Sequence, residues 1–339
     1  MSARIAVVGC GAIARAFHLP ALASLPDAAR RVIVVDPDRA RAEAAQREFA
    51  AHGAATDHRQ VLHEVDAAIV AVPQEFHAAV AMDFLRAGVA VLCEKPLATT
   101  LEEARALVAQ ADAAGTVLTV NNTHRHYPAA RAAWEWIRSG HPGRIRRIEV
   151  YEGERLVGWP LASGSTFGRR GTGKGALQDV GAHTLDMICW WLGERPGITR
   201  YLDDAMGGSE AVARVEFAGD GYRGVAHVSW LSRLSNTFRI ECERATLEGR
   251  ILAWDAIRVI PNGGRPRRMK LRRDVRSFSH VNTHVIRNFL AAAGGACQPA
   301  VPGREVLPSI AMIEECYGRR QRFPMPWFDT LAELSDVAR

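Results

Sequence analysis

Three side chains suited to acid–base chemistry stand in two separate motifs of the chain. Lys95 lies in the tetrapeptide CEKP at residues 93–96, and Asp179 and His183 lie in the stretch GKGALQDVGAHTLD at 173–186. If that stretch is helical, the two residues share one face, so the carboxylate can orient the imidazole and favour its protonated form. Taken singly, Lys95 is an ordinary loop lysine and His183 an ordinary structural histidine.

Together the three side chains match the requirements of alcohol oxidation. Hydride transfer from a secondary alcohol also requires removal of the hydroxyl proton, which a histidine titrating near neutrality can accept. An ammonium group beside the oxygen stabilises the alkoxide as it forms. We therefore expect Lys95, Asp179 and His183 to be the catalytic residues, with Lys95 and His183 also touching the substrate.

A glycine-rich turn, GCGAIA at residues 9–14, follows an apolar strand pattern and opens a helical one. Gly9 allows a tight turn, and Gly11 lets the backbone approach a pyrophosphate. The amides of the first helical residues, Ala12 and Ile13, then receive the phosphate charge. This context predicts a dinucleotide site, whereas the glycine pattern alone is also typical of a simple turn.

Asp36 ends the second strand pattern, where a carboxylate binds the adenosine ribose hydroxyls of a dinucleotide. A negative charge at this place repels the additional phosphate of NADP, so we expect NAD, with NADP the weaker candidate. Arg39 and Arg41 follow closely in the sequence and could offset this repulsion.

The strand and helix patterns divide the chain into two domains. In the first part, apolar strands alternate with alanine-rich helices, which predicts a parallel sheet covered on both faces: strands at 5–8, 32–36, 67–72, 89–93 and 117–120, and helices at 12–25, 38–51, 76–87 and 101–114. Further on, alternating strands dominate: 211–217, 222–230, 237–243, 246–252, 257–260 and 269–275, with helices at 175–192, 281–293 and 305–322. We expect an α/β protein, with a doubly wound Rossmann domain over residues 1–122 and an α+β domain with a large, mainly antiparallel open sheet over residues 123–339.

These motifs resemble those of the Gfo/Idh/MocA oxidoreductase family along nearly the whole chain. The resemblance rests on four segments: the turn at 9–11, AVP with a later histidine at 71–77, EKP at 94–96 and DVGAHTLD at 179–186. It implies that the lysine and histidine act at the reacting hydroxyl with the aspartate assisting, and that Pro73, His77 and Glu94 line the cofactor. It also implies dimer or tetramer contacts through the second sheet.

The chain departs from the family pattern after the sixth strand, where members carry a stretch like NRRF. Here the sequence is NNTHRHYP at 121–128, in which Arg125 and Tyr127 can be matched, and we expect both at the substrate. Trp159 lies in an expected loop, where its indole could stack on a sugar, shield the nicotinamide or cover the domain junction. His124 and His126 have the alternating spacing of some metal ligands, but no cysteine or carboxylate partner is evident, so we expect no metal. We expect one of them to line the substrate pocket or to pack against it.

Charge and composition limit the other classes of partner. The formal charge is +6 over 339 residues, but no nucleic-acid recognition motif accompanies it, so we expect no nucleic-acid partner. The basic run at 265–273 predicts an edge strand that discourages aggregation, or alternatively a patch for an anion. No apolar run is long enough to span a membrane, no signal-peptide pattern precedes the first strand, and the six cysteines are scattered, so we expect no membrane partner and a cytoplasmic location.

The sequence thus predicts reversible oxidation of a secondary hydroxyl on a carbohydrate-like small molecule, such as a sugar, polyol, cyclitol or sugar derivative, with NAD as hydride acceptor. Two alternatives stay open. The resemblance implies the first, because some members of the family use a tightly held NAD for transient oxidation, as an epimerase or an oxidative glycosidase, without net redox change. A cofactor-binding regulator that has lost catalysis is also possible, because fold alone does not fix function.

Overall fold

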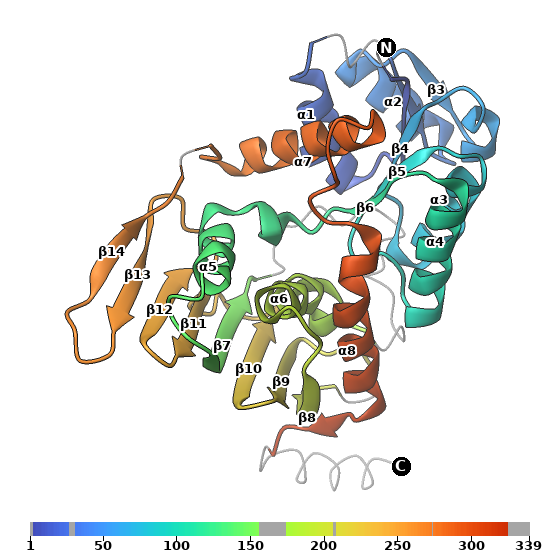
Figure 1. The fold of residues 1–339 in the computed structure, drawn as a ribbon. Coiled ribbons are helices and arrows are strands. Elements are labelled where there is room, and N and C mark those ends of the chain that lie inside the picture. Colours follow the sequence, from blue (N-terminus) through green and yellow to red (C-terminus); the bar gives the residue numbers. More distant parts are fainter. Residues whose placement is uncertain (1–2, 27–30, 156–173, 206–207, 273, 325–339) are drawn as a thin grey trace, which may run out of the picture.

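The structure, a computed structural model, describes residues 3–26, 31–155, 174–205, 208–272 and 274–324 (Figure 1). Its first sheet has six parallel strands in the order β3-β2-β1-β4-β5-β6. The bounds of these strands are β1 Ile5–Val8, β2 Val32–Val35, β3 Gly53–Ala55, β4 Ala67–Val70, β5 Ala90–Cys93 and β6 Leu118–Val120. The strand order reverses between β1 and β4, which is where open α/β sheets bind ligands at their carboxyl edge.

Both faces of this sheet are covered, as the continuous apolar strands predict. On β1, Ile5 and Val7 join one buried cluster, while Ala6 and Val8 join the other. The first cluster includes residues of α1 (Leu19–Ala23) and α2 (Arg39–Phe49), and the second includes residues of α3 (His77–Arg86) and α4 (Leu101–Ala114). The doubly wound Rossmann sheet is confirmed.

The first helix changes form near Pro20. Residues Ala14–His18 form a π-helix (η1), and α1 then starts with Pro20 in its first turn. Proline has no amide hydrogen to continue the ladder, so the first turn of a helix is the position that tolerates it.

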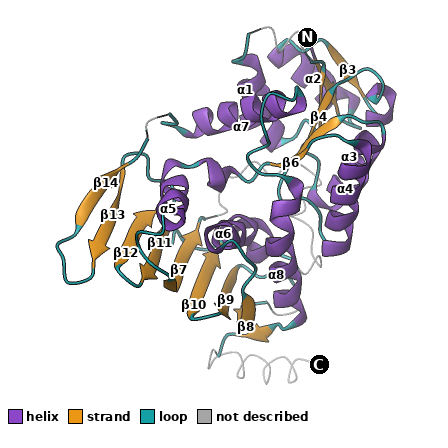
Figure 2. Cartoon of the chain, viewed as in Figure 1, coloured by secondary structure: helices purple, strands orange, loops and turns teal. Residues whose placement is uncertain are grey.

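The second sheet has nine strands in the order β14-β13-β12-β11-β7-β10-β9-β8-β15 (Figure 2). Their bounds are β7 Ile145–Gly153, β8 Gly197–Asp203, β9 Val212–Gly219, β10 Tyr222–Ser229, β11 Thr237–Cys242, β12 Ala245–Arg250, β13 Ala256–Pro261, β14 Arg267–Lys270 and β15 Gln321–Arg322. The pairs β10–β7 and β15–β8 are parallel and the others are antiparallel, so the expected mainly antiparallel sheet is confirmed. The strands β9 and β10 form a hairpin, with Gly221 at a φ of 74° in its turn.

Helices cover one face of the second sheet. The helices α5 (Pro128–Arg138), α6 (Ala176–Leu192) and α8 (Leu307–Gly318) lie on the side that faces the first domain (Figure 1). The helix α6 packs on β7, β9 and β10, and α8 packs on β8, α6 and α4. No helix of the described residues covers the opposite face, and β14 is its basic edge strand, as predicted from the run at 265–273.

The last part of the chain returns to the first domain. The helix α7 (Phe278–Ala293) packs against α1 and η1, and the Phe278 ring meets the Phe17 ring edge-on with 4.7 Å between centroids. Thr119 of β6 donates its hydroxyl to the carbonyl of Val301 at 2.8 Å and forms a β-bridge with Pro302. Residues near 278–306 therefore pack on the first domain, although the sequence predicts that this domain ends at residue 122.

No helix in the described ranges is long and apolar enough to cross a membrane. Those ranges also hold no group of three or more histidine, cysteine or acidic residues placed to bind a metal ion.

A buried histidine makes the fold sensitive to acid. His126, in the 3-10 helix η5 (Thr123–His126), is 3% exposed, and its ring lies edge-on to that of His284. Burial, followed by the charges of His284 and Arg131, lowers the pKa of His126 from 6.5 to about 3. The unfolded chain therefore binds this proton more tightly, and the free energy of unfolding falls as the pH drops from 6.5 toward 3.

Between pH 7 and pH 5, we expect the free energy of unfolding to fall by about 2 kcal/mol less in the His126→Gln variant than in the wild type. Urea unfolding at the two pH values measures the difference. His141→Gln replaces an exposed histidine and serves as the control. Equal losses in the wild type and His126→Gln would show that the native pKa of this histidine is not depressed.

Candidate active site

The glycine turn has the shape that a dinucleotide requires. Gly9 has a φ of 95°, and a Cβ there would lie 2.5 Å from the carbonyl oxygen of Ala71. At Gly11, no heavy atom of the described residues lies within 4 Å of the place a Cβ would take. Its lack of a side chain thus keeps open space above the backbone, and the partly exposed Ala12 and Ile13 follow in the first helical turn.

Asp36 stands directly beside this turn and is 3% exposed. Its two carboxylate oxygens accept from the backbone amides of Cys10 and Asp38, at 2.9 and 3.0 Å. The guanidinium of Arg41 lies 3.6 Å from the same carboxylate, so Arg41 is the basic neighbour that partly offsets its charge. The fixed carboxylate fits the expected ribose contact of a dinucleotide.

The Lys95 ammonium is held by Asp179. Lys95 follows β5 at the carboxyl edge of the first sheet, and its Nζ lies 2.5 Å from Asp179 Oδ1 and 3.2 Å from the Asp179 carbonyl oxygen. The second carboxylate oxygen of Asp179 accepts from the Trp230 indole at 3.0 Å. No hydrogen bond joins this carboxylate to the His183 ring, whose Nδ1 bonds Asn122 instead, so the expectation that Asp179 orients His183 is wrong.

His183 lies one turn further along α6 and is partly exposed. Its Nδ1 donates to Asn122 Oδ1 at 2.7 Å, and its ring stacks on that of His124 with 4.3 Å between centroids. Burial, followed by the charges of His124 and Lys95, lowers the pKa of His183 well below 6.5. The expected preference for the protonated form is therefore wrong, and the neutral ring is a proton acceptor at neutral pH.

Glu94 lies directly between β5 and Lys95 in the chain and is 8% exposed. His18 Nε2 and Asn121 Nδ2 both donate to its Oε1, at 2.7 and 2.6 Å. The Lys95 amide donates to Oε2 at 3.3 Å. Burial alone raises the pKa of Glu94. The hydrogen bond and charge of His18 and the hydrogen bond of Asn121 outweigh this effect, so the pKa lies below 4.5.

The two residues expected beside the cofactor after β4 have different environments. Pro73 is exposed at the carboxyl edge, where a cofactor can reach it. His77 is 2% exposed, and its ring nitrogens face the carbonyl oxygens of Pro96 and Val72 at 2.7 and 2.9 Å. The expected cofactor contact of His77 is therefore replaced by a structural link between two loops.

Two residues expected at the substrate are buried in the protein interior instead. Arg125 is 4% exposed, and its guanidinium binds both carboxylate oxygens of Asp186 and one of Glu305. Tyr127 is 1% exposed, and its ring packs edge-on against those of His124 and Trp254. Because both side chains are buried, the expectation that they contact the substrate is wrong. Trp159 lies outside the described residues.

A buried carboxylate caps the helix that carries Asp179 and His183. Glu210 is 0% exposed, and its Oε1 accepts from the amides of Gly175 and Leu177 at 3.0 and 2.9 Å. A carboxylate at a helix N-terminus accepts hydrogen bonds from the free amides, and its negative charge interacts favourably with the helix dipole. A Cβ on Gly175 would meet the Glu210 carbonyl oxygen at 1.9 Å, so the close approach requires glycine.

Four site residues were not singled out in the sequence: Asn122, Glu152, Trp230 and Glu210. Asn122 follows the end of β6, at the same carboxyl edge as Lys95, so the position of the strand end could have indicated it. Glu152 and Trp230 lie at the ends of two neighbouring strands of the second sheet. Their partners are distant in sequence, and no local pattern indicates those contacts.

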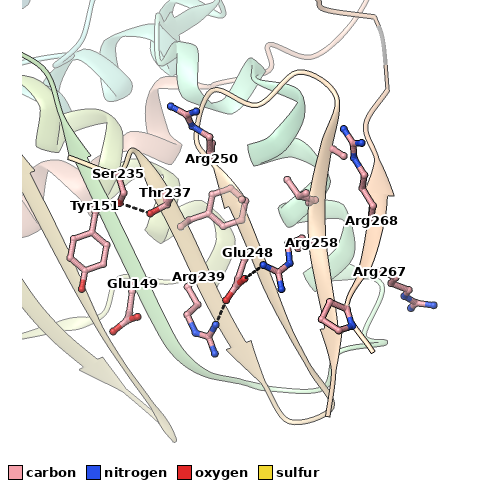
Figure 3. A pocket seen from close by; sticks show the side chains of 15 residues that line it. Glu149, Tyr151, Ser235, Thr237, Arg239, Glu248, Arg250, Arg258, Arg267 and Arg268 are labelled. Atoms are coloured by element: carbon pink, nitrogen blue, oxygen red, sulfur yellow. Dashed lines mark hydrogen bonds and ion pairs between the residues drawn. The ribbon is translucent and has the colours of Figure 1, made fainter. Parts of the chain in front are cut away.

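A hollow of about 760 Å³ lies elsewhere, on the open face of the second sheet (Figure 3). It is lined by side chains of β7, β11, β12, β13 and β14, and it shares no residue with the site around Lys95. Arginines and glutamates alternate along it, with Glu248 between Arg239 and Arg258.

The fold and the site define a nucleotide-binding oxidoreductase. The chain matches the model of the oxidoreductase family with an NAD-binding Rossmann fold over residues 3–122 and the model of the GFO/IDH/MocA C-terminal domain over residues 130–248. Together the two matches cover more than half of the chain, which belongs to the Gfo/Idh/MocA family, and NAD is the cofactor that the family model describes.

Named relatives act on carbohydrates. Levoglucosan dehydrogenase of Pseudarthrobacter phenanthrenivorans is 31% identical, over 59% of this chain and 53% of that protein. D-apiose dehydrogenase of Paraburkholderia graminis is 26% identical, over 92% of this chain and 86% of that protein. The chain thus matches about half the length of the first relative and most of the second.

The fold is also that of solved structures. A levoglucosan dehydrogenase in complex with NADH superposes with a TM-score of 0.80 at 19% identity, over 93% of this chain and 96% of that one. At this identity the likeness shows the fold.

Proposed function

We propose that this chain is an NAD-dependent dehydrogenase that interconverts a secondary hydroxyl and a ketone on a sugar, polyol, cyclitol or sugar derivative. The observation that carries the proposal is the meeting of Lys95, held by Asp179, with a neutral His183 at the carboxyl edge of the Rossmann sheet. The names of the relatives, which are dehydrogenases of levoglucosan and D-apiose, support the substrate class.

The site divides the chemistry among its residues. The turn at Gly9 and Gly11 and the Asp36 carboxylate would hold NAD, which would serve as the hydride acceptor. His183 Nε2 accepts the hydroxyl proton, since its Nδ1 already donates to Asn122. Lys95 Nζ donates to the substrate oxygen and stabilises its negative charge, while Asp179 and the Trp230 indole keep the lysine in place.

A screen of NADH formation across polyols, free sugars and sugar conjugates tests the proposal. We expect turnover with at least one compound that carries a secondary hydroxyl, and no turnover with matched primary alcohols. NAD that co-purifies and is not consumed would favour an epimerase or oxidative glycosidase instead. NAD binding without reaction on any compound would contradict a catalytic function and favour a regulator.

Cofactor preference depends on Asp36. We expect the wild type to prefer NAD, and Asp36→Asn to lower the ratio of kcat/KM for NAD over NADP by roughly tenfold, because a charge that repels the additional phosphate is removed. Asp38→Asn is the control, since it removes a nearby exposed charge but keeps an equally good helix cap. An unchanged ratio in Asp36→Asn would show that other residues set the preference.

The open face of the second sheet is proposed as a contact between copies of this chain, in a homodimer or a homotetramer. On this face Arg239 pairs with Glu248 (Figure 3), and Arg147 pairs with Glu149. A two-fold axis would bring the arginines of one copy to the glutamates of the other. Light scattering should give more than one copy, and Arg239→Glu should lower the number. A monomeric wild type would exclude this contact.

A further inference from the structure

The proposed base His183 is held along one edge by Asn122. The His183 Nδ1 donates to Asn122 Oδ1 at 2.7 Å, and Asn122 is 2% exposed. An amide oxygen can only accept a hydrogen bond, so the proton of the neutral ring is on Nδ1. The lone pair is then on Nε2, which is the atom that must accept the proton of the substrate hydroxyl.

A second contact fixes the plane of the same ring. The His124 and His183 rings are stacked with 4.3 Å between centroids and 11° between planes. His124 Nε2 donates to Glu152 Oε1 at 2.5 Å, and Thr184 donates its hydroxyl to Glu152 Oε2 at 2.5 Å. Since Thr184 follows His183 on α6, the carboxylate of β7 ties both the supporting ring and the helix to one place.

These contacts matter because few other contacts of the described residues hold the His183 ring in one orientation. Asp179 is engaged by Lys95 and Trp230, so no carboxylate of the described residues bonds the His183 ring. A histidine base in the wrong tautomer cannot accept a proton at the reacting atom, and such an error costs a catalytic triad about 10⁴-fold in kcat. An uncharged acceptor at Nδ1 selects the tautomer without raising the pKa of the ring as a carboxylate would.

We propose that Asn122, His124 and Glu152 are positioning residues for His183. Asn122 sets its tautomer, and the His124–Glu152 pair sets the plane of its ring. This inference rests on the proposed function for its catalytic meaning, but the tautomer and the stacking are properties of the protein without substrate. They can therefore be tested even if no substrate is found.

The tautomer is tested by NMR of the protein labelled with ¹⁵N-histidine, with the His183 signals assigned from their loss in His183→Gln. We expect the Nδ1-protonated tautomer in the wild type and its loss in Asn122→Leu. Asn122→Asp should keep this tautomer and raise the pKa of His183 by about 1–3 units. A wild-type ring protonated at Nε2, or an Asn122→Leu ring that stays protonated at Nδ1, would overturn the proposal.

Kinetic measurements with a substrate found in the screen are the second test of the proposal. We expect Asn122→Leu to lower kcat roughly 100-fold with the Kd for NAD unchanged, and Asn122→Asp to move the acid limb of kcat/KM upward with the pKa. His124→Leu should lower kcat, and His124→Phe should recover part of it, because a flat ring still stacks but cannot donate to Glu152. Equal kcat in His124→Leu and His124→Phe would exclude the stacking role.

The matched control is Asn282→Leu. Asn282 is also buried, on α7, and its amide donates to a backbone carbonyl of the same helix. Its tautomer spectrum and pH profile should equal those of the wild type. If the screen finds no reaction but the NMR results hold, the proposed function fails while the positioning of His183 stands.

Discussion

The variant Lys95→Met is expected to lower kcat by about 10²–10³-fold while its Kd for NAD stays close to that of the wild type. The Lys95 ammonium carries the positive charge beside the reacting oxygen, and its distance of 2.5 Å to Asp179 Oδ1 shows that it is fixed before any substrate arrives. Methionine keeps much of the side-chain length and removes the charge. Initial rates of NADH formation and calorimetric titration with NAD measure the two quantities separately.

The control for this experiment is Lys270→Met. Lys270 is an exposed lysine on the edge strand β14, so the same substitution there should leave both kcat and the Kd for NAD unchanged. If Lys95→Met keeps full turnover on a substrate that the wild type oxidises, the ammonium has no part in stabilising the alkoxide. If it loses NAD binding as well, Lys95 acts on the cofactor rather than on the reaction.

The sequence predicted which residues meet, because strand ends carry that information. Lys95 follows a buried parallel strand, and the carboxyl ends of parallel strands share one edge of the sheet, where Gly9 and Asp36 also lie. The helix with Asp179 and His183 was recognisable from its pattern and the family motif. The first inference uses only periodicity and strand direction, which are local properties of the chain, and the second also uses the resemblance to the family.

The partners of these side chains were not predictable in the same way. Helical spacing places Asp179 and His183 on one face. It does not indicate that the ammonium of Lys95, which follows β5 in the chain, binds the Asp179 carboxylate. The pKa of His183 depends first on its burial and then on the charges of His124 and Lys95, two residues that are distant in sequence. Tertiary packing therefore reversed the expected protonation preference.

Some elements were also missed for physical reasons. The strand β8 (Gly197–Asp203) alternates weakly, since Thr199 and Arg200 are both exposed between the buried Ile198 and Tyr201. The helix α5 (Pro128–Arg138) begins at a proline within the motif that was read for its substrate contacts. Proline at the first helical position is a start signal, and this signal could have identified α5.

The burial of Arg125 leads to the second large prediction. Asp186→Asn is expected to lower the free energy of unfolding by about 3–5 kcal/mol, because it leaves a buried guanidinium without its bidentate partner. The Arg125 and Asp186 side chains are 3% and 0% exposed, and two donors of Arg125 lie 2.8 and 2.7 Å from the carboxylate oxygens. Glu305 is the other anion beside the guanidinium, but its side chain is 47% exposed and compensates less. Urea unfolding at neutral pH measures the change.

Two further variants decide whether the cost comes from the unpaired charge. Asp112→Asn removes a carboxylate from the exposed Arg304–Asp112 pair, and it should change the stability by at most about 1 kcal/mol. The double variant Arg125→Met with Asp186→Leu replaces both charges by apolar groups and should recover most of the lost stability. If the double variant is as unstable as Asp186→Asn, the hydrogen-bond geometry matters more than the charge. If Asp186→Asn is instead stable and raises the KM for the sugar, Arg125 reaches the substrate after all, as the family pattern first suggested.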